Sequence, residues 1–190
     1  MRVKKYRVFK GQMARAASNI LARNFDATQP NEKWVTDVTE FNVAGQKLYL
    51  SPIMDLYNGK LLPNETAKHP LLNMMEKMLT SAFKRLGPGD KPILHSDQGL
   101  QYRMPQYRRY LDLQAVTQSM SRNGNCHDNA AMESFFGTLK SEFFHLNDLR
   151  SLEELQTGLD EYIQYYNQDQ IKLKLKGLSP INCRMRFTSN

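Results

Sequence analysis

Three acidic residues lie where exposure to solvent does not explain them. Asp37 interrupts the apolar, β-branched stretch WVTDVTEF, Asp97 follows the apolar stretch PILHS, and Glu133 opens an amphipathic stretch after a polar loop. Three carboxylates that meet at one end of a sheet repel one another unless a cation neutralises them. Their oxygens suit Mg²⁺ or Mn²⁺, and two such ions can stabilise both the attacking and the leaving oxygen of a phosphodiester displacement. The pattern therefore predicts a metal-dependent phosphoryl-transfer site.

Each of these acids also has an ordinary structural interpretation. An Asp within a strand is often an edge or hydrogen-bonding residue, and a Glu in the first turn of a helix interacts favourably with the helix dipole. The pattern alone leaves both interpretations open. Two further acids, Asp55 and Glu40, lie near the expected centre, and for them a structural or turn role is expected.

Two other motifs suggest different chemistry and do not hold together. His95 and Ser96 precede Asp97, but consecutive strand residues point to alternate faces and cannot form a Ser-His-Asp relay among themselves. His95 is therefore expected to pack in the core or to support the site. Cys126 and His127 are adjacent, but the sequence has no second pair of residues at the spacing of a zinc site.

The elements that must position the acids follow from hydrophobic periodicity. The order of three strands, then alternating helices and strands, predicts an α/β fold with a five-stranded mixed sheet flanked by helices. Trp34 is expected to anchor the first strand in the core. The predicted strands are 34–43, 47–56, 60–67, 91–97 and 115–121, and the predicted helices are 12–23, 71–86, 104–114, 129–146 and 151–168.

The basic residues gather at the two ends of the chain. The 190 residues carry a net charge of +7, and seven of the 26 basic residues lie in 1–25, where there is no acid. The segment after Asp169 is also basic and free of acids. Basic ends of this kind either grip a polyanion such as DNA or are solvated tails. The expected organisation is a basic segment and linker at 1–33, a catalytic core at 34–168 and a basic tail at 169–190.

Composition excludes several classes of protein. A hydrophobic content of 41% with 24% charged residues is typical of a globular protein, and no apolar run is long enough for a membrane helix. Two cysteines make no disulfide framework, so a reduced cytoplasmic protein is expected. The glycines show no phosphate-cradling pattern, which fits an enzyme that needs no nucleotide cofactor.

The helix that carries Glu133 has two distinct faces. Glu133, Gly137 and Lys140 share one side because seven residues make nearly two turns. The adjacent apolar side should hold the helix on the sheet; it consists of Met132, Phe135, Phe136, Leu139 and Phe143. The preceding loop 122–128, RNGNCHD, has no packing residue and is expected to be mobile.

Several long stretches, in this order, resemble the catalytic half of orfB-type insertion-sequence transposases, whose core is similar to retroviral integrase. They are WVTDVTEF, LYLSPIMDLYNG, PILHSDQG, GNCHDNAAMESFFGTLKSE and IKLKLKGLSP. The family has an Asp-Asp-Glu set with 35 residues between the last two and a basic residue seven beyond the Glu. Here 35 residues separate Asp97 from Glu133, and Lys140 lies seven beyond.

This resemblance implies a ribonuclease H-like fold and a magnesium-dependent transposase of the bacterial cytoplasm, associated with the nucleoid and not with a membrane. Asp37, Asp97 and Glu133 would be the catalytic residues and the ligands of two Mg²⁺ (or Mn²⁺) ions. The partners would be DNA, as element ends and target, a homo-oligomer on that DNA and full-length transposase. The residues expected to contact DNA are Lys140, Arg122, Lys172, Lys174 and Lys176.

The sequence departs from the family in ways that leave alternatives open. Family members carry another N-terminal portion with helix-turn-helix elements, so the resemblance implies an N-terminally truncated transposase. One alternative is a non-catalytic DNA-binding or regulatory fragment that modulates full-length transposase. Another is a nuclease of the same fold, such as a junction resolvase, which would give hydrolysis products without strand transfer. Leu100 also stands where an aromatic residue often follows the SDQG motif.

Overall fold

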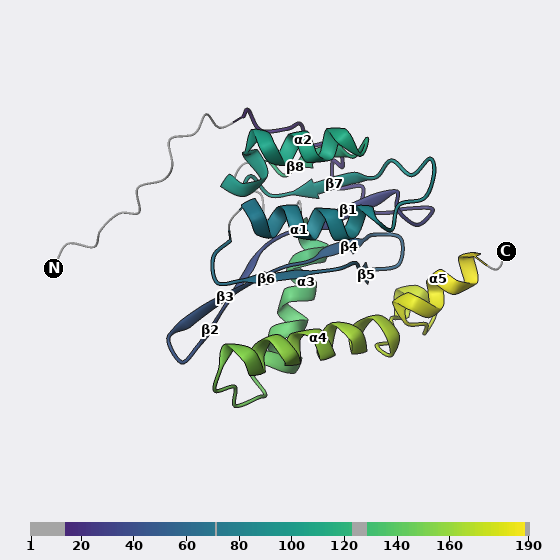
Figure 1. The fold of residues 1–190 in the computed structure, drawn as a ribbon. Helices are drawn as coiled ribbons and strands as arrows, with labels where there is room; N and C mark the ends of the chain where they lie inside the picture. Colours follow the sequence, from purple (N-terminus) through teal and green to yellow (C-terminus); the bar gives the residue numbers. More distant parts are fainter. Residues whose placement is uncertain (1–13, 71, 123–128, 189–190) are drawn as a thin grey trace.

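The computed structural model describes residues 14–70, 72–122 and 129–188. Helices α1 (Leu72–Phe83) and α2 (Pro105–Leu113) cover one face of a central sheet. Helices α3 (Ala130–Leu139) and α4 (Leu152–Gln168) cover the other face (Figure 1). The predicted α/β architecture is therefore confirmed.

The sheet is mixed, as predicted, and its strands form two hydrogen-bonded sets. In the five-stranded set the order is β5-β4-β1-β7-β8, with β1 antiparallel to β4 and parallel to β7. The other set has the order β2-β3-β6. The strands are β1 (Lys33–Thr36), β2 (Thr39–Val43), β3 (Gln46–Ser51), β4 (Ile53–Asp55), β5 (Lys60–Leu61), β6 (Glu65–Ala67), β7 (Ile93–Ser96) and β8 (Thr117–Met120).

The first two predicted strands are interrupted, and the two interruptions lie across from each other. The predicted strand 34–43 is divided at Asp37 and Val38, and the predicted strand 47–56 is divided at Pro52. The pairing Thr36 with Ile53 resumes as Thr39 with Leu50, so both breaks fall at the same level. Pro52 has no N–H to donate to a ladder. The break leaves Asp37 just beyond the end of β1.

Successive residues of β1 supply two separate cores. Trp34 is fully buried beneath α1 and α2, which confirms its predicted role as a core anchor. Val35 packs on the opposite face against α3 and α4. The predicted apolar side of α3 is also confirmed, because Met132, Phe135, Phe136 and Leu139 are buried in this second core and Phe143 packs against it.

Three helical predictions were wrong or incomplete. Residues 14–23, predicted as part of a helix over 12–23, form no helix and instead run along the sheet edge, where Ile20 N–H donates to Ser119 Oγ. The predicted helix 129–146 changes after Leu139 into a π-helical segment, Lys140–Phe144. The predicted tail contains a helix, α5 (Pro180–Thr188), at the right of Figure 1.

No helix in the described ranges is both long enough and apolar enough to span a membrane.

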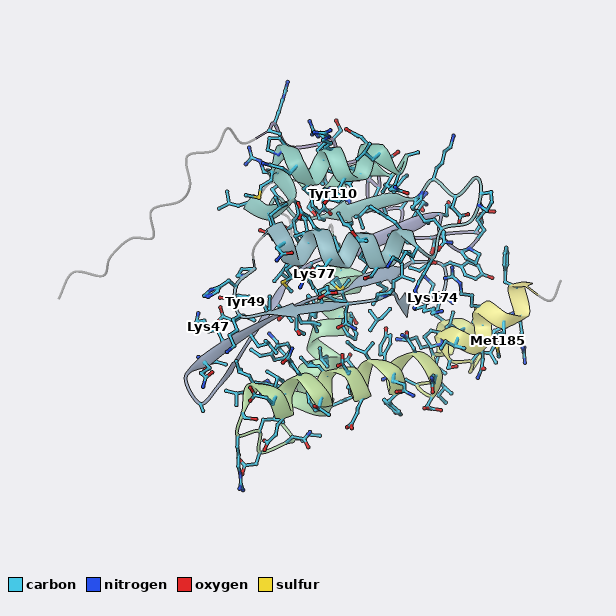
Figure 2. All side chains as sticks on the ribbon, in the orientation of Figure 1. Lys47, Tyr49, Lys77, Tyr110, Lys174 and Met185 are labelled. Carbon is cyan, nitrogen blue, oxygen red and sulfur yellow. The ribbon has the colours of Figure 1, made fainter. Side chains whose placement is uncertain are left out.

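Lys47 and Tyr49 lie together on β3 (Figure 2), and both donate hydrogen bonds to the carboxylate of Glu40 on β2. Glu40 therefore joins neighbouring strands, in line with the structural role expected for it.

Candidate active site

Asp37 is the half-buried member of the predicted acidic set. It lies in the break after β1, and its Oδ1 accepts a hydrogen bond of 2.7 Å from Val38 N–H. Burial raises the pKa of Asp37 to about 6, and the negative charges of Asp97 and Glu133 add to this increase. Both charged residues that shift this pKa are acids, so the carboxylate lies in a field that opposes its ionisation.

Asp97 follows β7, the strand that lies beside β1. Its side chain is exposed, and Oδ1 accepts the Gly99 N–H at 2.8 Å, which closes a tight Asx turn. A β-carbon on Gly99 would lie 2.9 Å from Asp97 Oδ1 and 2.6 Å from Gln101 Nε2. Both separations are too short for carbon, so the absence of a β-carbon at Gly99 lets the Asp97 and Gln101 side chains approach the turn this closely.

Glu133 lies in the first turn of α3 with an exposed side chain. The helix is preceded by Asn129, whose Nδ2 donates to the Thr36 carbonyl at 3.3 Å instead of capping the helix. This bond ties the start of α3 to the residue before Asp37. Asn129 Oδ1 is buried, and no described group donates a hydrogen bond to it.

The three acids share one region of the molecule without forming a closed ligand set. Within the three described ranges, no three His, Cys, Asp or Glu side chains are close enough to hold one ion. The negative charges of Asp97 and Glu133 nevertheless act on Asp37. Asp97 and Glu133 are therefore close enough to Asp37 for their charges to act on it.

Tyr102 is a fully buried residue on which the charges of two of these acids act, and the sequence had not singled it out. Burial raises the pKa of its phenol well above the usual value, and the charge of Asp37 and then of Asp97 contribute to the increase. Its ring packs edge-on against Tyr107 at a centroid distance of 5.4 Å. These two acids thus lie near a buried aromatic pair, and such low-polarity surroundings raise the free energy of an ionised carboxylate that has no counter-ion.

His95 lies within the sheet, two residues before Asp97. It is fully buried, and its Nδ1 lies 2.8 Å from Ser119 Oγ while its Nε2 lies 3.1 Å from Ser121 Oγ. Ser96 Oγ donates to the Asp97 carbonyl and makes no contact with the imidazole that would form a relay. His95 therefore packs in the core, one of the two roles expected for it, and these residues form no Ser-His-Asp relay.

Asp55 has the structural role expected for it. It is fully buried, and its Oδ2 accepts hydrogen bonds from Arg184 Nη1 at 2.8 Å and from Asn31 N–H at 2.9 Å. Its Oδ1 accepts from Tyr57 N–H at 3.1 Å. This ion pair fastens α5 to the sheet, together with a bond of 2.7 Å from Asn58 Nδ2 to the Pro180 carbonyl.

Of the basic residues predicted to contact DNA, Lys140 lies closest to the acids along the chain. It follows α3 on the same side as Glu133, and its ammonium lies 5.5 Å from the centre of the Phe41 ring. Arg122 is exposed just before the undescribed segment. The rest of the predicted mobile loop 122–128, including Cys126 and His127, lies outside the described residues.

The other three predicted DNA contacts lie on the turn that leads to α5. Lys172 is half-buried, with its ammonium 2.7 Å from the Tyr166 hydroxyl and 4.0 Å from the centre of that ring. Burial lowers the pKa of Lys172. Lys174 pairs with Asp26 at 3.4 Å, and Lys176 is exposed with a left-handed backbone, φ 55°.

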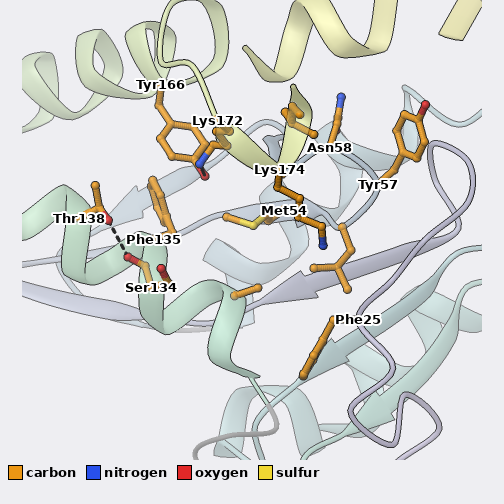
Figure 3. A pocket seen from close by; sticks show the side chains of 14 residues that line it. Phe25, Met54, Tyr57, Asn58, Ser134, Phe135, Thr138, Tyr166, Lys172 and Lys174 are labelled. Carbon is orange, nitrogen blue, oxygen red and sulfur yellow. Dashed lines mark hydrogen bonds between the residues drawn. The ribbon is translucent and has the colours of Figure 1, made fainter. Parts of the chain in front are cut away.

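A cavity of about 280 Å³ separates this turn from α3 (Figure 3). Ser134 and Phe135 of α3 form one wall, and Lys172 and Lys174 lie across from them. Phe25 closes another side. Its lining residues from α3 flank Glu133 in sequence, but the side chain of Glu133 does not line it.

Two family comparisons cover most of the chain. A family described as "Integrase core domain" matches residues 27–126, and a second family with the same description matches residues 133–186. The first match contains Asp37 and Asp97, and the second begins at Glu133.

Curated relatives are similar over nearly the whole chain. The InsK protein for insertion sequence element IS150 of Escherichia coli (strain K12) is 54% identical over 184 residues, covering 97% of this chain and 65% of InsK. An uncharacterized transposase-like protein of Haemophilus influenzae is 50% identical, covering 96% of this chain and 84% of that protein. The transposase InsF for IS3A of Escherichia coli is 32% identical, in a match that covers 86% of this chain and 57% of InsF. The chain thus spans about two thirds or less of InsK and InsF.

Solved structures share the fold at low identity. The HTLV-2 integrase catalytic core domain in complex with magnesium, in its trimeric form, superposes with a TM-score of 0.65 at 16% identity, covering 83% of this chain and 99% of that chain. A simian T-cell lymphotropic virus intasome chain gives a TM-score of 0.64 at 19% identity, covering 85% of this chain and 55% of that chain. The fold is therefore that of retroviral integrase catalytic cores, and the predicted ribonuclease H-like class is confirmed.

Proposed function

This chain belongs to the insertion-sequence transposases with an integrase core domain, and we propose that it cuts DNA at the ends of an insertion element and joins those ends to target DNA. The observations that support this proposal are the positions of Asp37 and Asp97 just beyond the ends of neighbouring strands and the charges of Asp97 and Glu133, which add to the effect of burial on the Asp37 pKa. A regulatory fragment without catalysis would not need three acids in one region, and this alternative is not favoured.

The chemistry of the three side chains fits two Mg²⁺ or Mn²⁺ ions. All the candidate donors are carboxylate oxygens, which these ions prefer, and the repulsion at Asp37 is the kind that a cation relieves. Asp37, Asp97 and Glu133 would hold the ions. When bound, such ions supply charge neutralisation and polarisation for attack on a phosphodiester by water or by a DNA 3′-hydroxyl.

The protein residues would arrange the reactants. The strand breaks hold Asp37 at the end of β1, the Asx turn holds Asp97 beside it, and Asn129 ties the start of the Glu133 helix to the same strand end. Lys140, on the Glu133 side of α3, would bind a DNA phosphate near the cut. Cutting is hydrolysis, and joining is a transesterification that needs no high-energy cofactor.

The partners we propose are element-end DNA, target DNA and further copies of the chain. Transposition brings two ends together, and the neighbouring structures are described as an intasome and as trimeric and dimeric integrase cores. We therefore propose that this chain forms a homo-oligomer on DNA in the bacterial cytoplasm and nucleoid. Longer transposases of the same element are a further proposed partner.

A cleavage and joining assay tests this function. Purified protein is incubated with duplexes that carry the flanking element's ends, in Mg²⁺, in Mn²⁺ or in EDTA, and both nicked and joined products are measured. We expect metal-dependent nicking and joining by the wild type. Asp97→Asn should abolish both while retaining the circular-dichroism spectrum and DNA binding.

The products separate the proposal from its rivals. Hydrolysis without joined products would indicate a nuclease of the same fold. Nicking that persists in the purified Asp97→Asn variant would contradict the assignment of the acids. DNA binding without any reaction in either metal would support the regulatory alternative.

A further inference from the structure

His95 forms a hydrogen-bonded chain that ends beside Asp97. The imidazole lies between Ser119 of β8 and Ser121, which follows that strand. Nδ1 lies 2.8 Å from Ser119 Oγ, and Nε2 lies 3.1 Å from Ser121 Oγ. His95 is paired with Ser119 in the parallel ladder between β7 and β8. All three side chains are buried.

The backbone of the N-terminal segment determines which groups donate and which accept in this series of hydrogen bonds. Ser119 Oγ accepts N–H groups from Ile20 at 2.9 Å and from Leu21 at 3.3 Å. A hydroxyl has two acceptor lone pairs and one proton, so Ser119 has only its proton left for the imidazole. Nδ1 must therefore accept, and the proton of the neutral imidazole lies on Nε2.

The Ser121 hydroxyl is the next group in this series of hydrogen bonds. Because Nε2–H donates to Ser121 Oγ, that hydroxyl is held in place as an acceptor and retains its own proton for donation. The backbone around it is also fixed, since Ser121 N–H donates to the Ser96 carbonyl and Gln98 Nε2 donates to the Ser121 carbonyl. A buried, oriented hydroxyl donor is thus available at this point.

Strand register gives this donor a target. Ser96 is paired with Met120, so the next residues of the two strands, Asp97 and Ser121, lie side by side. Alternate residues of a strand share a face, which places Asp97 on the side of His95, and Ser121 on the side of Ser119. Since His95 and Ser119 face each other, Asp97 and Ser121 are expected on that same face. In this structure Asp97 Oδ1 accepts the Gly99 N–H and Ser121 Oγ contacts His95, so the two side chains are neighbours without a direct hydrogen bond.

We propose that, when a divalent cation binds, the Ser121 hydroxyl, oriented by His95, donates a hydrogen bond to the Asp97 carboxylate and so positions it as a ligand. This inference rests on the proposed function, because it gives Asp97 the role of a metal ligand. Ser121 is a positioning residue: it acts through Asp97. Hydrogen bonds from surrounding groups to ligand carboxylates commonly set metal affinity.

A matched pair of substitutions at residue 121 tests the proposal. Thr and Val have the same shape, but only Thr retains the hydroxyl, so Ser121→Thr and Ser121→Val impose the same added bulk. Mn²⁺ binding to each full-length protein is measured by calorimetry, and the Mn²⁺-induced shift in melting temperature is measured in parallel. Ser51→Ala is the control for the effect of changing a buried serine on stability. Ser51 lies on β3, and its hydroxyl contacts Met78 of α1.

The expected result is that Ser121→Thr binds Mn²⁺ as tightly as the wild type does. Ser121→Val should bind about tenfold or more weakly. Equal affinities for the Thr and Val variants, with Asp97→Asn failing to bind, would overturn the positioning role and leave the proposed function intact. A wild type that binds no Mn²⁺, alone or with duplex DNA, would contradict the metal site itself. If Val prevents folding, Ser121→Ala replaces it and is compared with the wild type by the same two measurements.

Discussion

Two aspartates on neighbouring strands, Asp37 and Asp55, show how burial acquires opposite meanings. Asp55 is fully buried at one end of the β1–β4 pair and is matched by the Arg184 guanidinium and two backbone N–H groups. Asp37 is half-buried at the other end, and the charged residues that act on its pKa are Asp97 and Glu133. One carboxylate is complete within the protein, whereas the other is arranged against its own ionisation.

The difference separates a structural acid from a functional one. A buried charge whose hydrogen bonds and counter-ion come from the chain holds elements together, as Asp55 holds α5. An acid that the fold places next to other acids is costly to retain unless something outside the chain compensates it. The partners of an acid, more than its depth, therefore indicate its role.

The largest expected effect is on catalysis, and it should divide the two aspartates completely. Asp37→Asn should reduce Mg²⁺-dependent strand cleavage by a factor on the order of 10³ or more, because it removes a ligand charge at the reacting centre. Cleavage is measured as initial rate on element-end duplexes, at a temperature where both variants are folded. A comparable loss in Asp55→Asn under those conditions would remove the distinction between the two acids.

The second expected effect is on stability, and its order is reversed. Asp55→Asn leaves the partly buried Arg184 charge without its carboxylate partner, and breaking a buried pair costs up to about 3–5 kcal/mol. Urea unfolding at pH 7 measures the loss. The matched control is Asp26→Asn, whose exposed pair with Lys174 should contribute little. If Asp55→Asn were no more destabilising than this control, Arg184 would not be fastening α5.

Much of this fold could be predicted because periodicity reports burial. The five predicted strands and the helices that cover them follow from apolar spacing, and Trp34 and the apolar side of α3 lie where the spacing places them. Pro52 was a local signal for the break in its strand, because proline cannot donate to a ladder. The matching break at Asp37 could not be predicted, because it depends on how this strand aligns with its neighbour.

The missed features depend on contacts between distant segments. Helix α5 has a Ser-Pro pair at its start, a usable signal, but its docking depends on Arg184 reaching Asp55. Residues 14–23 form no helix, and the N–H groups of Ile20 and Leu21 bind Ser119 instead. The ties from Asn129 to Thr36 and from His95 to Ser121 had no local pattern that would predict them.

A smaller effect should appear in the pH dependence of stability. The folded pKa of Asp37, about 6, exceeds its reference value of 3.8, so the folded protein binds this proton more tightly than the unfolded chain does. The stabilising contribution of that proton is present below about pH 4 and is lost as pH rises through 6. The shift corresponds to about 2–3 kcal/mol.

Urea unfolding in EDTA at pH 4 and pH 7.5 measures this contribution. Relative to Asp37→Asn, the wild type should lose about 2–3 kcal/mol more between the two pH values. Saturating Mg²⁺ at pH 7.5 should restore stability to the wild type and not to the variant. Identical pH profiles for the two proteins would mean that Asp37 is not held against its ionisation.

The smallest effect concerns two lysines that extend the same contrast from acids to cations. The Lys172 ammonium already donates to the Tyr166 hydroxyl at 2.7 Å and has a pKa lowered by burial, whereas Lys140 lies on the Glu133 side of α3. Each phosphate contact on duplex DNA contributes about 0.9 to the slope of log affinity against log salt. Lys140→Ala should therefore reduce that slope by about 1, and Lys172→Ala should reduce it by less.

Fluorescence anisotropy with a labelled element-end duplex, over a series of salt concentrations, measures both slopes. Lys172→Met, which preserves most of the stem that packs on Tyr166, separates loss of charge from loss of packing. A larger change in slope for Lys172→Met than for Lys140→Ala would place the DNA track over the α5 turn. In that case Lys172, which already donates a hydrogen bond to Tyr166, would be the lysine that binds phosphate. Pairing within the protein would then identify structural acids but would not identify structural cations.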